Sequence, residues 1–262
     1  MPRSPRPRQW ILLRGLTRES AHWGDFAADL QQALPADQVL ALDLPGNGQF
    51  HTVPSPLSVQ AMVQACRNEL ARRAVAPPYH LLAMSLGAMV ATEWARAAPG
   101  EVAGCILINT SMRPFSPFYH RLRPYNLAAL LQLARKWRSQ SASDAEAAER
   151  IVLRITSNRA PDRGAAIPLW AAVRQQRPVS ARNALRQLVA AARYQAPATA
   201  PGVPLLLLGS TQDQLVAHQC SKSIAKAWGI PLHKHPSAGH DLPLDDPQWV
   251  INELVQWVEW TA

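Results

Sequence analysis

Short apolar runs alternate along this chain with segments whose apolar residues recur every three to four positions. Apolar runs of four to eight residues are typical of strands buried on both faces of a parallel sheet, whereas the three-to-four spacing indicates amphipathic helices. The predicted strands lie at 9–13, 79–84, 104–110, 204–209 and 232–235. The pattern therefore predicts an α/β fold with a mostly parallel, doubly wound sheet.

This alternation stops after Asn109 and resumes near Val203. In between, prolines interrupt a series of helical patterns, such as the spacing of Leu127, Leu130 and Leu131. A helical insertion within an α/β core is the simplest organisation that explains the break. The sequence thus predicts three regions. A flexible basic tail comprises residues 1–8, an α/β core comprises two segments, 9–110 and 200–262, and a helical basic cap or lid comprises residues 111–199.

The strand predicted at 79–84 leads directly into a serine flanked by small residues. Ala83 and Gly87 stand two positions before and two after Ser85, in the pattern A-x-S-x-G. A sharp strand-to-helix turn exposes a serine hydroxyl for nucleophilic attack, and small neighbours relieve the crowding in such a turn. We therefore predict Ser85 as a nucleophile. Taken alone, the pentapeptide also fits the start of a helix after a buried strand, and Ala83 departs from the commoner glycine.

Candidates for a general base and its orienting acid follow in the chain order Ser, Asp, His. Asp213 lies in the loop after the strand at 204–209, and His240 follows Gly239 in a loop before the last helix. The carboxyl ends of parallel strands meet at one edge of a sheet, so both loops should reach the edge that carries Ser85. Each residue also has a simpler interpretation, an Asx turn for the aspartate and a solvated loop position for the histidine.

The acidic residues that follow His240 are predicted to be structural. Asp241 is expected to point away from the imidazole. Asp245 and Asp246 are predicted to cap the helix that begins near Pro247.

Acyl transfer also needs hydrogen-bond donors where negative charge develops. The backbone N–H of Leu86, directly after Ser85, is one predicted donor. The N–H of Leu16, in the loop Arg14-Gly15-Leu16 after the first strand, is the second, so that the two amides would form an oxyanion hole. The Arg14 side chain either lies near the substrate, where its charge would alter substrate preference, or forms a structural ion pair.

With these residues in place, the chain resembles the α/β-hydrolase superfamily, in particular the cofactor-free bacterial esterases and C–C hydrolases, a branch that includes the pimeloyl-[acyl carrier protein] methyl ester esterases. Further points of likeness are Arg14-Gly15 followed by Trp23, the turn at 42–48, the strand at 104–110 and the Gly239-His240 loop. Where the family has His-Gly, this chain has Arg-Gly. The resemblance implies a mostly parallel sheet with the helical cap inserted after the sixth strand. It also implies hydrolysis of an ester or related acyl bond in a small-molecule substrate, with no metal ion and no organic cofactor.

Length and composition fit one domain in a reducing compartment. The 262 residues, 48% of them hydrophobic, suffice for one large α/β core with a modest insertion. No apolar run approaches the roughly 20 residues of a membrane span, and the apolar stretch after the basic N-terminus is too short for a secretion signal. The three cysteines cannot all pair, and none has a metal-binding or C-x-x-C spacing. A cytoplasmic location is therefore predicted.

Positive charge is concentrated in the predicted cap. Residues 111–195 hold 15 basic and four acidic side chains (+11), and the rest of the chain holds 12 basic and 14 acidic ones (−2), for a total of +9. On a helical wheel, Arg182, Arg186 and Arg193 fall within about 40° of one another in the last cap helix. Such a stripe either attracts phosphates or carboxylates or is a solvated helix face. A separate face of the same helix is predicted from Ala184, Leu185, Leu188 and Ala192.

The leading hypothesis about function is a serine hydrolase that cleaves a carboxylic ester through an acyl-enzyme on Ser85. One alternative is an esterase or thioesterase whose cap arginines dock acyl groups bound to acyl carrier protein or coenzyme A. Two others are a hydrolase of C–C bonds in diketones and a non-catalytic basic binding module. Nucleic-acid binding is not favoured, because no binding motif accompanies the charge.

Overall fold

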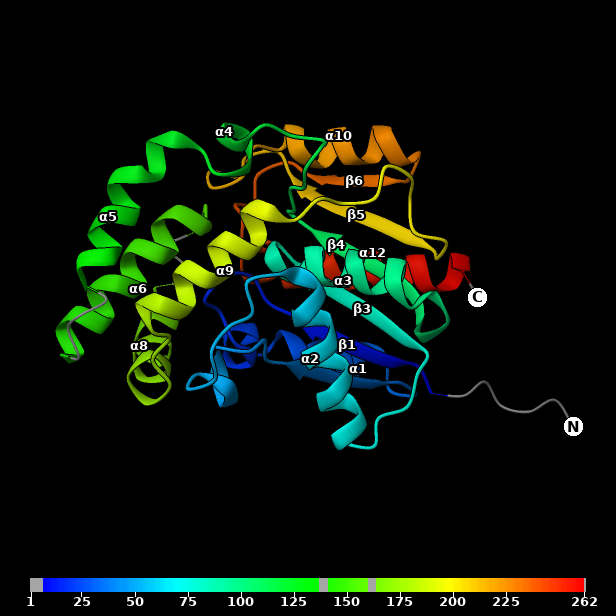
Figure 1. The fold of residues 1–262 in the computed structure, drawn as a ribbon, viewed down its shortest axis with the longest axis horizontal. Coiled ribbons are helices and arrows are strands. Elements are labelled where there is room, and N and C mark those ends of the chain that lie inside the picture. The colour runs from blue at the N-terminus through cyan, green and yellow to red at the C-terminus, as the bar shows by residue number, and fades with distance from the viewer. Residues whose placement is uncertain (1–6, 137–140, 160–163, 262) are drawn as a thin grey trace, which may run out of the picture.

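Six strands form one sheet, in which all neighbouring strands are parallel (Figure 1). The computed structural model describes residues 7–136, 141–159 and 164–261, so the predicted tail lies outside the described residues up to residue 6. Arg8 is tied to the core, because its backbone N–H donates to Asp37 Oδ1 at 3.0 Å. The strands are β1 (Gln9–Leu13), β2 (Gln38–Leu42), β3 (Tyr79–Met84), β4 (Val102–Ile108), β5 (Leu205–Ser210) and β6 (Leu232–His235).

The order of the strands brings two predicted functional loops side by side. Across the sheet the order is β2-β1-β3-β4-β5-β6, so the sequence order reverses between β1 and β3. Open α/β sheets bind their ligands at the carboxyl ends of the strands that flank such a reversal. Leu13 at the end of β1 pairs in register with Ala83 of β3. The loop with Leu16 therefore starts beside the turn with Ser85.

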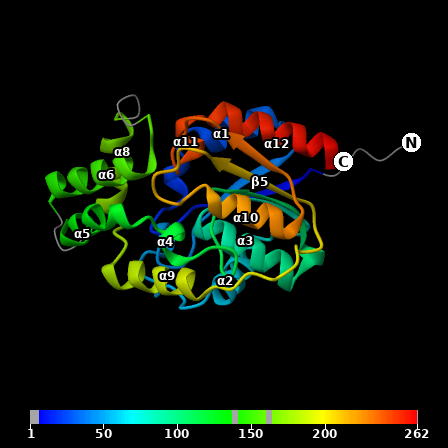
Figure 2. The same ribbon diagram turned by 90° about the horizontal axis from the view of Figure 1, so that it is seen from above.

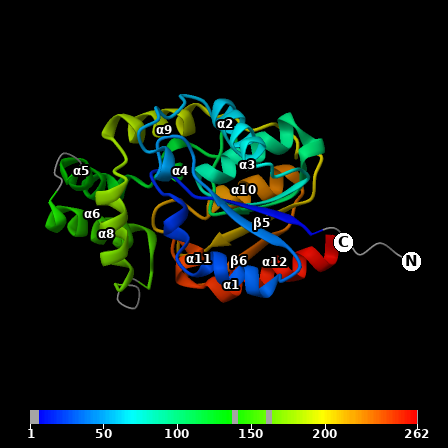
Figure 3. The same ribbon diagram turned by 90° about the horizontal axis from the view of Figure 1, so that it is seen from below.

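Helices cover both faces of the sheet, as the sequence predicts (Figure 2, Figure 3). The long helices of the core are α1 (Phe26–Ala33), α2 (Val59–Arg72), α3 (Leu86–Ala97), α10 (Gln219–Trp228) and α12 (Pro247–Thr261). Helices α1 and α12 pack on the face that carries Trp10 and Leu12. Helices α2, α3 and α10 pack on the face that carries Ile11 and Leu13. Because successive strand residues point to opposite faces, one uninterrupted apolar run supplies both cores.

Short helical elements complete the described core and its connections. They are η1 (Ser20–Trp23), η2 (Gly48–Phe50), η3 (Pro99–Glu101) and α11 (Leu242–Asp245), whereas η4 (Pro124–Asn126) belongs to the cap. No described helix has the length and apolar character needed to cross a membrane. Cys66, Cys105 and Cys220 are buried free thiols. Burial raises the pKa of Cys66 to about 12, which keeps it protonated and unreactive at neutral pH.

The described part of the segment between β4 and β5 is mainly helical, and α5, α6 and α8 lie at the end of the molecule opposite both termini (Figure 1). Its helices are α4 (Phe118–Arg121), α5 (Leu127–Lys136), α6 (Ala142–Thr156), α8 (Ala166–Gln176) and α9 (Ala181–Arg193). The insertion follows the fourth strand and not a sixth, because residues 7–110 form only four strands. The cap has a small apolar centre of its own, formed by Leu153, Ile167 and Trp170, against which Leu244 of the core packs.

Helix α9 faces the core with a different side from the apolar one noted in the sequence. Leu185 and Leu188 are 61% and 45% exposed. Gln187 is fully buried; its Nε2 donates to Asn47 Oδ1 at 2.8 Å, and its Oε1 accepts from the Thr17 N–H at 2.8 Å. Buried loop groups need hydrogen-bond partners, and this requirement turns the polar side of the helix inward. The buried face comprises Asn183, Ala184, Gln187 and Ala190.

Candidate active site

Ser85 lies in the tight turn between β3 and α3. Its backbone has φ 55° and ψ −115°, a strained conformation for a residue with a side chain. The Ser85 N–H donates to the Ile108 carbonyl at 3.0 Å, and Thr110 Oγ1 donates to the Ser85 carbonyl at 3.0 Å. The Ser85 side chain stays half-buried between fully buried neighbours. The turn thus presents a hydroxyl at the carboxyl edge of the sheet.

Two glycines allow the loop after β1 to approach this turn closely. A Cβ atom on Gly87 would lie 2.5 Å from the Leu13 carbonyl oxygen and 2.7 Å from that of Arg14. A Cβ atom on Gly15 would lie 3.1 Å from Ser85 Cβ. Position 87, the second small position of the A-x-S-x-G pattern, therefore requires glycine, because the start of α3 touches the backbone at the end of β1.

Asp213 and His240 form a buried pair. His240 Nδ1 lies 2.7 Å from Asp213 Oδ2, and the two side chains are 4% and 2% exposed. The other oxygen, Asp213 Oδ1, accepts from the N–H groups of Leu215 and Val216 at 2.8 and 2.9 Å. An ionised carboxylate only accepts, so the shared hydrogen belongs to Nδ1 and the lone pair of the neutral ring lies on Nε2. The aspartate thus forms the Asx turn and also binds the histidine.

Asn109 fastens the His240 loop to the end of β4. Its Nδ2 donates to the carbonyls of Gly239 and His240, at 3.2 and 2.8 Å, and to Ser210 Oγ at 2.9 Å. Its Oδ1 accepts from the Ser210 N–H at 2.7 Å. Asn109 directly follows the β4 residue whose carbonyl binds the Ser85 N–H. Sequence analysis assigned this residue no role, and its position directly after a buried strand was the only available signal.

The three predicted catalytic residues are not all joined by hydrogen bonds. His240 contacts Asp213, whereas no hydrogen bond between Ser85 and His240 occurs among the described residues. The turn of Ser85 and the loop of His240 are nevertheless fixed to adjacent residues at the end of β4. Contacts between a nucleophile and its base are often long in unliganded enzymes and tighten when substrate binds.

The N–H groups of Leu86 and Leu16 have no hydrogen-bond acceptor among the described residues. Leu86 is the first residue of α3, and the first N–H groups of a helix have no acceptor within the helix. Leu16 follows Gly15, which packs against Ser85. The two amides thus come from the two loops that border Ser85, as an oxyanion hole requires.

Arg14 forms a buried ion pair, the second of the two interpretations that the sequence allowed. Its Nη1 and Nη2 donate to Oδ1 and Oδ2 of Asp241, at 3.0 and 2.5 Å, and the two side chains are 3% and 4% exposed. Nη1 also lies 3.6 Å from Met84 Sδ. Burial opposes ionisation of Asp241, but Arg14 outweighs it and holds the pKa of this carboxyl below its usual value. Arg14 therefore contacts both Met84, which precedes Ser85, and Asp241, which follows His240.

The next two acidic residues of this loop differ from one another. Asp246 Oδ1 accepts from the Trp249 N–H at 3.1 Å, which is the predicted cap at the start of α12. Asp245 is fully buried, and its Oδ2 accepts from the N–H groups of Asn158 and Gly239 at 3.0 and 2.7 Å. The prediction that Asp245 caps α12 is therefore wrong. The buried amides between the cap and the core need an acceptor, and Asp245 supplies it.

The three arginines of α9 occupy different environments. Arg182 and Arg193 are exposed, whereas Arg186 is half-buried. Arg186 Nε donates to the carbonyl of Ser55. The predicted stripe therefore consists of two exposed cations and one side chain that anchors α9 to the core.

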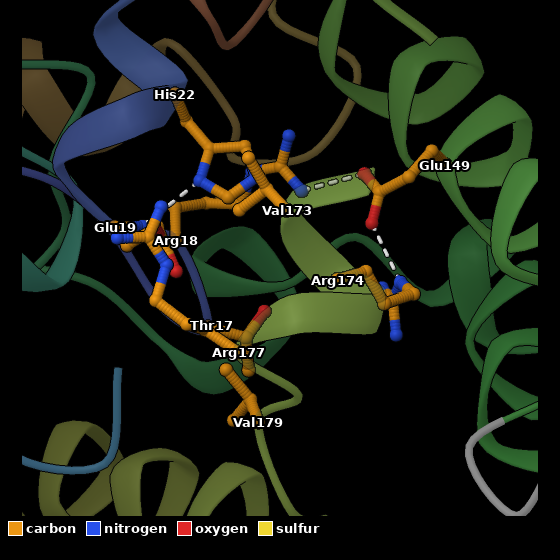
Figure 4. Close-up of a pocket in the computed structure, with 9 residues that line it drawn as sticks. All are labelled: Thr17, Arg18, Glu19, His22, Glu149, Val173, Arg174, Arg177 and Val179. Carbon is orange, nitrogen blue, oxygen red and sulfur yellow. Dashed lines mark hydrogen bonds and ion pairs between the residues drawn. The ribbon is translucent and has the colours of Figure 1, made fainter. Parts of the chain in front are cut away.

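A cavity lined by charged residues lies where the cap meets the core (Figure 4). Sequence analysis selected none of its residues, because they come from separate segments and match no motif. Within residues 7–136, 141–159 and 164–261, no group of three His, Cys, Asp or Glu side chains is arranged to hold a metal ion. The lining residues are Thr17, Arg18, Glu19 and His22 of the core and Glu149, Val173, Arg174, Arg177 and Val179 of the cap.

Comparison with known proteins identifies relatives of the chain. The model of the α/β hydrolase family matches residues 10–253. Over 87 residues, the chain is 36% identical to a pimeloyl-[acyl-carrier protein] methyl ester esterase of Xylella fastidiosa, a match that covers 33% of this chain and 31% of that protein. Over 262 residues, it is 26% identical to the biotin biosynthesis bifunctional protein BioHC of Cellvibrio japonicus, covering 96% of this chain and 48% of that protein. The chain thus matches less than half the length of either curated relative.

Solved structures share the fold at low sequence identity. The enol-lactonase from Burkholderia xenovorans LB400 superposes with a TM-score of 0.77 at 14% identity, over 98% of this chain and 93% of that one. An esterase from Rhodococcus sp. ECU1013 superposes with a TM-score of 0.72 at 19% identity, over 98% of this chain and 92% of that one. Together with the family match over most of the sequence, this fold shows that the chain belongs to the α/β hydrolase family.

Proposed function

We propose that the protein is a serine hydrolase that cleaves carboxylic esters through an acyl-enzyme on Ser85. The observation that carries this proposal is the buried contact of 2.7 Å between His240 Nδ1 and Asp213 Oδ2, in a loop that is fastened beside the turn of Ser85. A histidine held at Nδ1 by a carboxylate is oriented to accept a proton at Nε2. The names of curated relatives, which are methyl ester esterases, support the same class of reaction.

In the proposed reaction, His240 Nε2 accepts the hydroxyl proton while Ser85 Oγ attacks the acyl carbonyl carbon. Asp213 stabilises the imidazolium, and the Leu86 and Leu16 amides donate to the oxyanion of the tetrahedral intermediate. Collapse of this intermediate breaks the ester C–O bond, and the imidazolium protonates the departing alcohol. Water deprotonated by His240 then attacks the acyl-enzyme and releases the acid.

Labelling with a fluorophosphonate probe, together with hydrolysis of p-nitrophenyl acetate, butyrate and octanoate, tests the nucleophile. We expect Ser85→Ala to abolish labelling and to lower kcat by roughly three orders of magnitude or more, with an unchanged circular dichroism spectrum. Ser143→Ala, which removes an exposed hydroxyl of the cap, is the matched control and should behave as wild type. Unchanged turnover in Ser85→Ala would contradict the assignment. Absence of labelling in folded wild-type protein would favour the non-catalytic binding module.

An ester linked to an acyl carrier protein or to coenzyme A is a second candidate substrate. Its support is the exposure of Arg182 and Arg193 on α9, together with relatives named pimeloyl-[acyl-carrier protein] methyl ester esterase. An acidic carrier with a phosphopantetheine arm would be steered to these cations and would pair with them. Arg186 contributes less to this surface, because its guanidinium already binds Ser55.

Charge reversal separates docking from chemistry. We expect Arg182→Glu combined with Arg193→Glu to raise KM for a carrier-linked methyl ester by about tenfold or more and to leave p-nitrophenyl butyrate hydrolysis unchanged. Lys222→Glu combined with Lys226→Glu reverses the same number of exposed charges on α10 and serves as the control. Equal changes in KM for both double variants, or for both substrates, would rule out docking on α9.

A further inference from the structure

The cavity between the segment after β1 and the cap has more hydrogen-bond donors than acceptors. Its volume is about 20 Å³, enough for one water molecule or for a compact polar group. Three N–H groups of its lining residues are buried and have no hydrogen-bond partner among the described residues. They are Arg18 Nη2, His22 Nε2 and Arg177 Nε, whereas only one buried acceptor of the lining, Glu19 Oε1, makes no hydrogen bond among the described residues. The lining side chains converge from the core and from the cap (Figure 4).

His22 is a donor and not an acceptor toward this cavity. Its Nδ1 accepts from the Glu19 N–H at 3.0 Å, so the hydrogen of the neutral ring lies on Nε2. Burial, together with the nearby Arg18, holds the pKa of His22 well below its usual value. The ring is therefore neutral at pH 7. Because the residue is only 6% exposed, its Nε2 hydrogen needs an acceptor inside the protein.

Positive charge exceeds negative charge around the cavity. Arg18 Nη1 and Arg174 Nε both donate to Glu149, at 2.6 and 2.7 Å, and Arg177 Nη2 lies 2.6 Å from Glu19 Oε1. Arg18 and Arg174 thus both bind Glu149, and Arg177 faces Glu19. Burial raises the pKa of Glu19 to about 7, against the opposing effect of Arg177, so part of its negative charge is absent at neutral pH. The cavity therefore repels cations and favours a group that brings both acceptors and negative charge.

We propose that this cavity binds a carboxylate, whose oxygens accept from Arg18, His22 and Arg177. A carboxylate offers only acceptors, so it complements the unpaired donors, and it brings negative charge to Arg18 and Arg177, which hold two of these donors. Its occupancy connects the core to the cap, because Arg177 lies directly after α8 and the other two donors follow β1. The binding does not depend on the ester hydrolysis proposed above.

The bound carboxylate belongs either to a free small acid or to the acidic end of a longer ligand. Thr17, one of the residues that line the cavity, directly follows Leu16, whose loop borders Ser85. A chain that leaves the cavity toward Ser85 would therefore run along the loop after β1. Comparing acetate with hexanoate distinguishes the two sources.

Isothermal titration calorimetry and thermal unfolding at neutral pH and constant ionic strength test the site. We expect acetate to bind wild-type protein saturably and to raise Tm, and its neutral isostere acetamide to do neither. Arg177→Gln should weaken acetate binding at least about tenfold. Arg150→Gln, which changes an exposed arginine on α6 outside the cavity, should bind acetate as wild type does. Tighter binding of hexanoate than of acetate would identify a longer ligand, and equal binding a free small acid.

Three results would overturn the proposal: no saturable acetate binding, equal effects of acetate and acetamide, or equal losses in Arg177→Gln and Arg150→Gln. The first two need only wild-type protein, so the test remains decisive if Arg177→Gln does not fold. Failure of ester hydrolysis in the Ser85 experiment would leave these measurements unaffected.

Discussion

Among single residues, Asp213 combines a structural and a proposed catalytic role in one carboxylate. Its Oδ1 is held by the Leu215 and Val216 amides, and its Oδ2 faces His240. The backbone contacts orient the carboxylate, so its second oxygen is in place before any substrate arrives. Removing its charge should consequently alter the position of the proton on His240 more than it alters the fold.

Asp213→Asn tests this division of roles. The amide oxygen can still accept from the backbone N–H groups, but its NH₂ group would face His240 Nδ1 and favour the tautomer with hydrogen on Nε2. We expect kcat for p-nitrophenyl butyrate to fall by about 10³- to 10⁴-fold, because that tautomer cannot deprotonate Ser85. Asp25→Asn, at an exposed position, is the control. Near wild-type kcat in folded Asp213→Asn protein would remove the aspartate from the mechanism.

Between elements, the contact of α3 with the end of β1 sets the separation of the two proposed oxyanion donors. Gly87 lies against the backbone of Leu13 and Arg14. Arg14 stands two residues before Leu16, which carries the second donor. The Leu86 amide is at the start of the same helix. A change in the spacing between helix and strand therefore moves the donors apart.

Gly87→Ala places a methyl group in this contact. Its Cβ would meet two backbone carbonyl oxygens, at 2.5 and 2.7 Å, which cannot rotate away. We expect a loss of unfolding free energy of about 1–3 kcal/mol, as for other overpacked sites, and slower fluorophosphonate labelling of Ser85. Gly100→Ala is the matched control, because its added Cβ has no neighbour within 4 Å. Wild-type stability and labelling in Gly87→Ala would show that the contact is not tight.

For the whole molecule, buried ion pairs connect the cap to the core. Glu149 of α6 binds Arg18 of the core and Arg174 of α8, and its side chain is 1% exposed. Burial opposes ionisation of Glu149, but the two arginines outweigh it and hold its pKa below the usual value of 4.5. A carboxyl whose pKa is lowered by folding contributes stability above its usual pKa, and this contribution disappears as the pH falls through the lowered value.

Glu149→Gln should therefore destabilise the protein most at neutral pH. Two partly buried arginines lose their shared counter-charge, for which we expect a loss of about 3 kcal/mol in unfolding free energy at pH 7 and a fall in Tm of several degrees. As the pH falls below 4.5 the difference from wild type should shrink, because Glu149 of the unfolded wild-type chain becomes protonated first and folded Glu149 follows only at its lowered pKa. Glu146→Gln, an exposed neighbour paired with Arg150, should cost less than about 1 kcal/mol. A Tm difference that does not vary with pH would contradict this account.

Features encoded in short segments were predictable from the sequence. Five of the six strands, the helices on both faces and the turn at Ser85 each follow from fewer than about a dozen consecutive residues, and the α/β fold is confirmed. Strand β2, most of whose residues are only partly buried, was not predicted. The roles of Ser85, Asp213 and His240 remain predictions, although the contact between the last two agrees with them. The number of strands before the cap was wrong because it came from the resemblance and not from the pattern of this chain.

The sequence by itself determined the layered architecture and the residue types of the proposed site, because strand length, turn chemistry and chain order are local properties. Only the tertiary structure decided which distant polar groups meet. Arg14 and Asp241 are 227 residues apart and form one buried pair. Gln187 turns inward to satisfy loop amides, and the donors of the cavity come from the core and from the cap. Burial makes each of these pairings necessary, and burial depends on the packing of the whole chain.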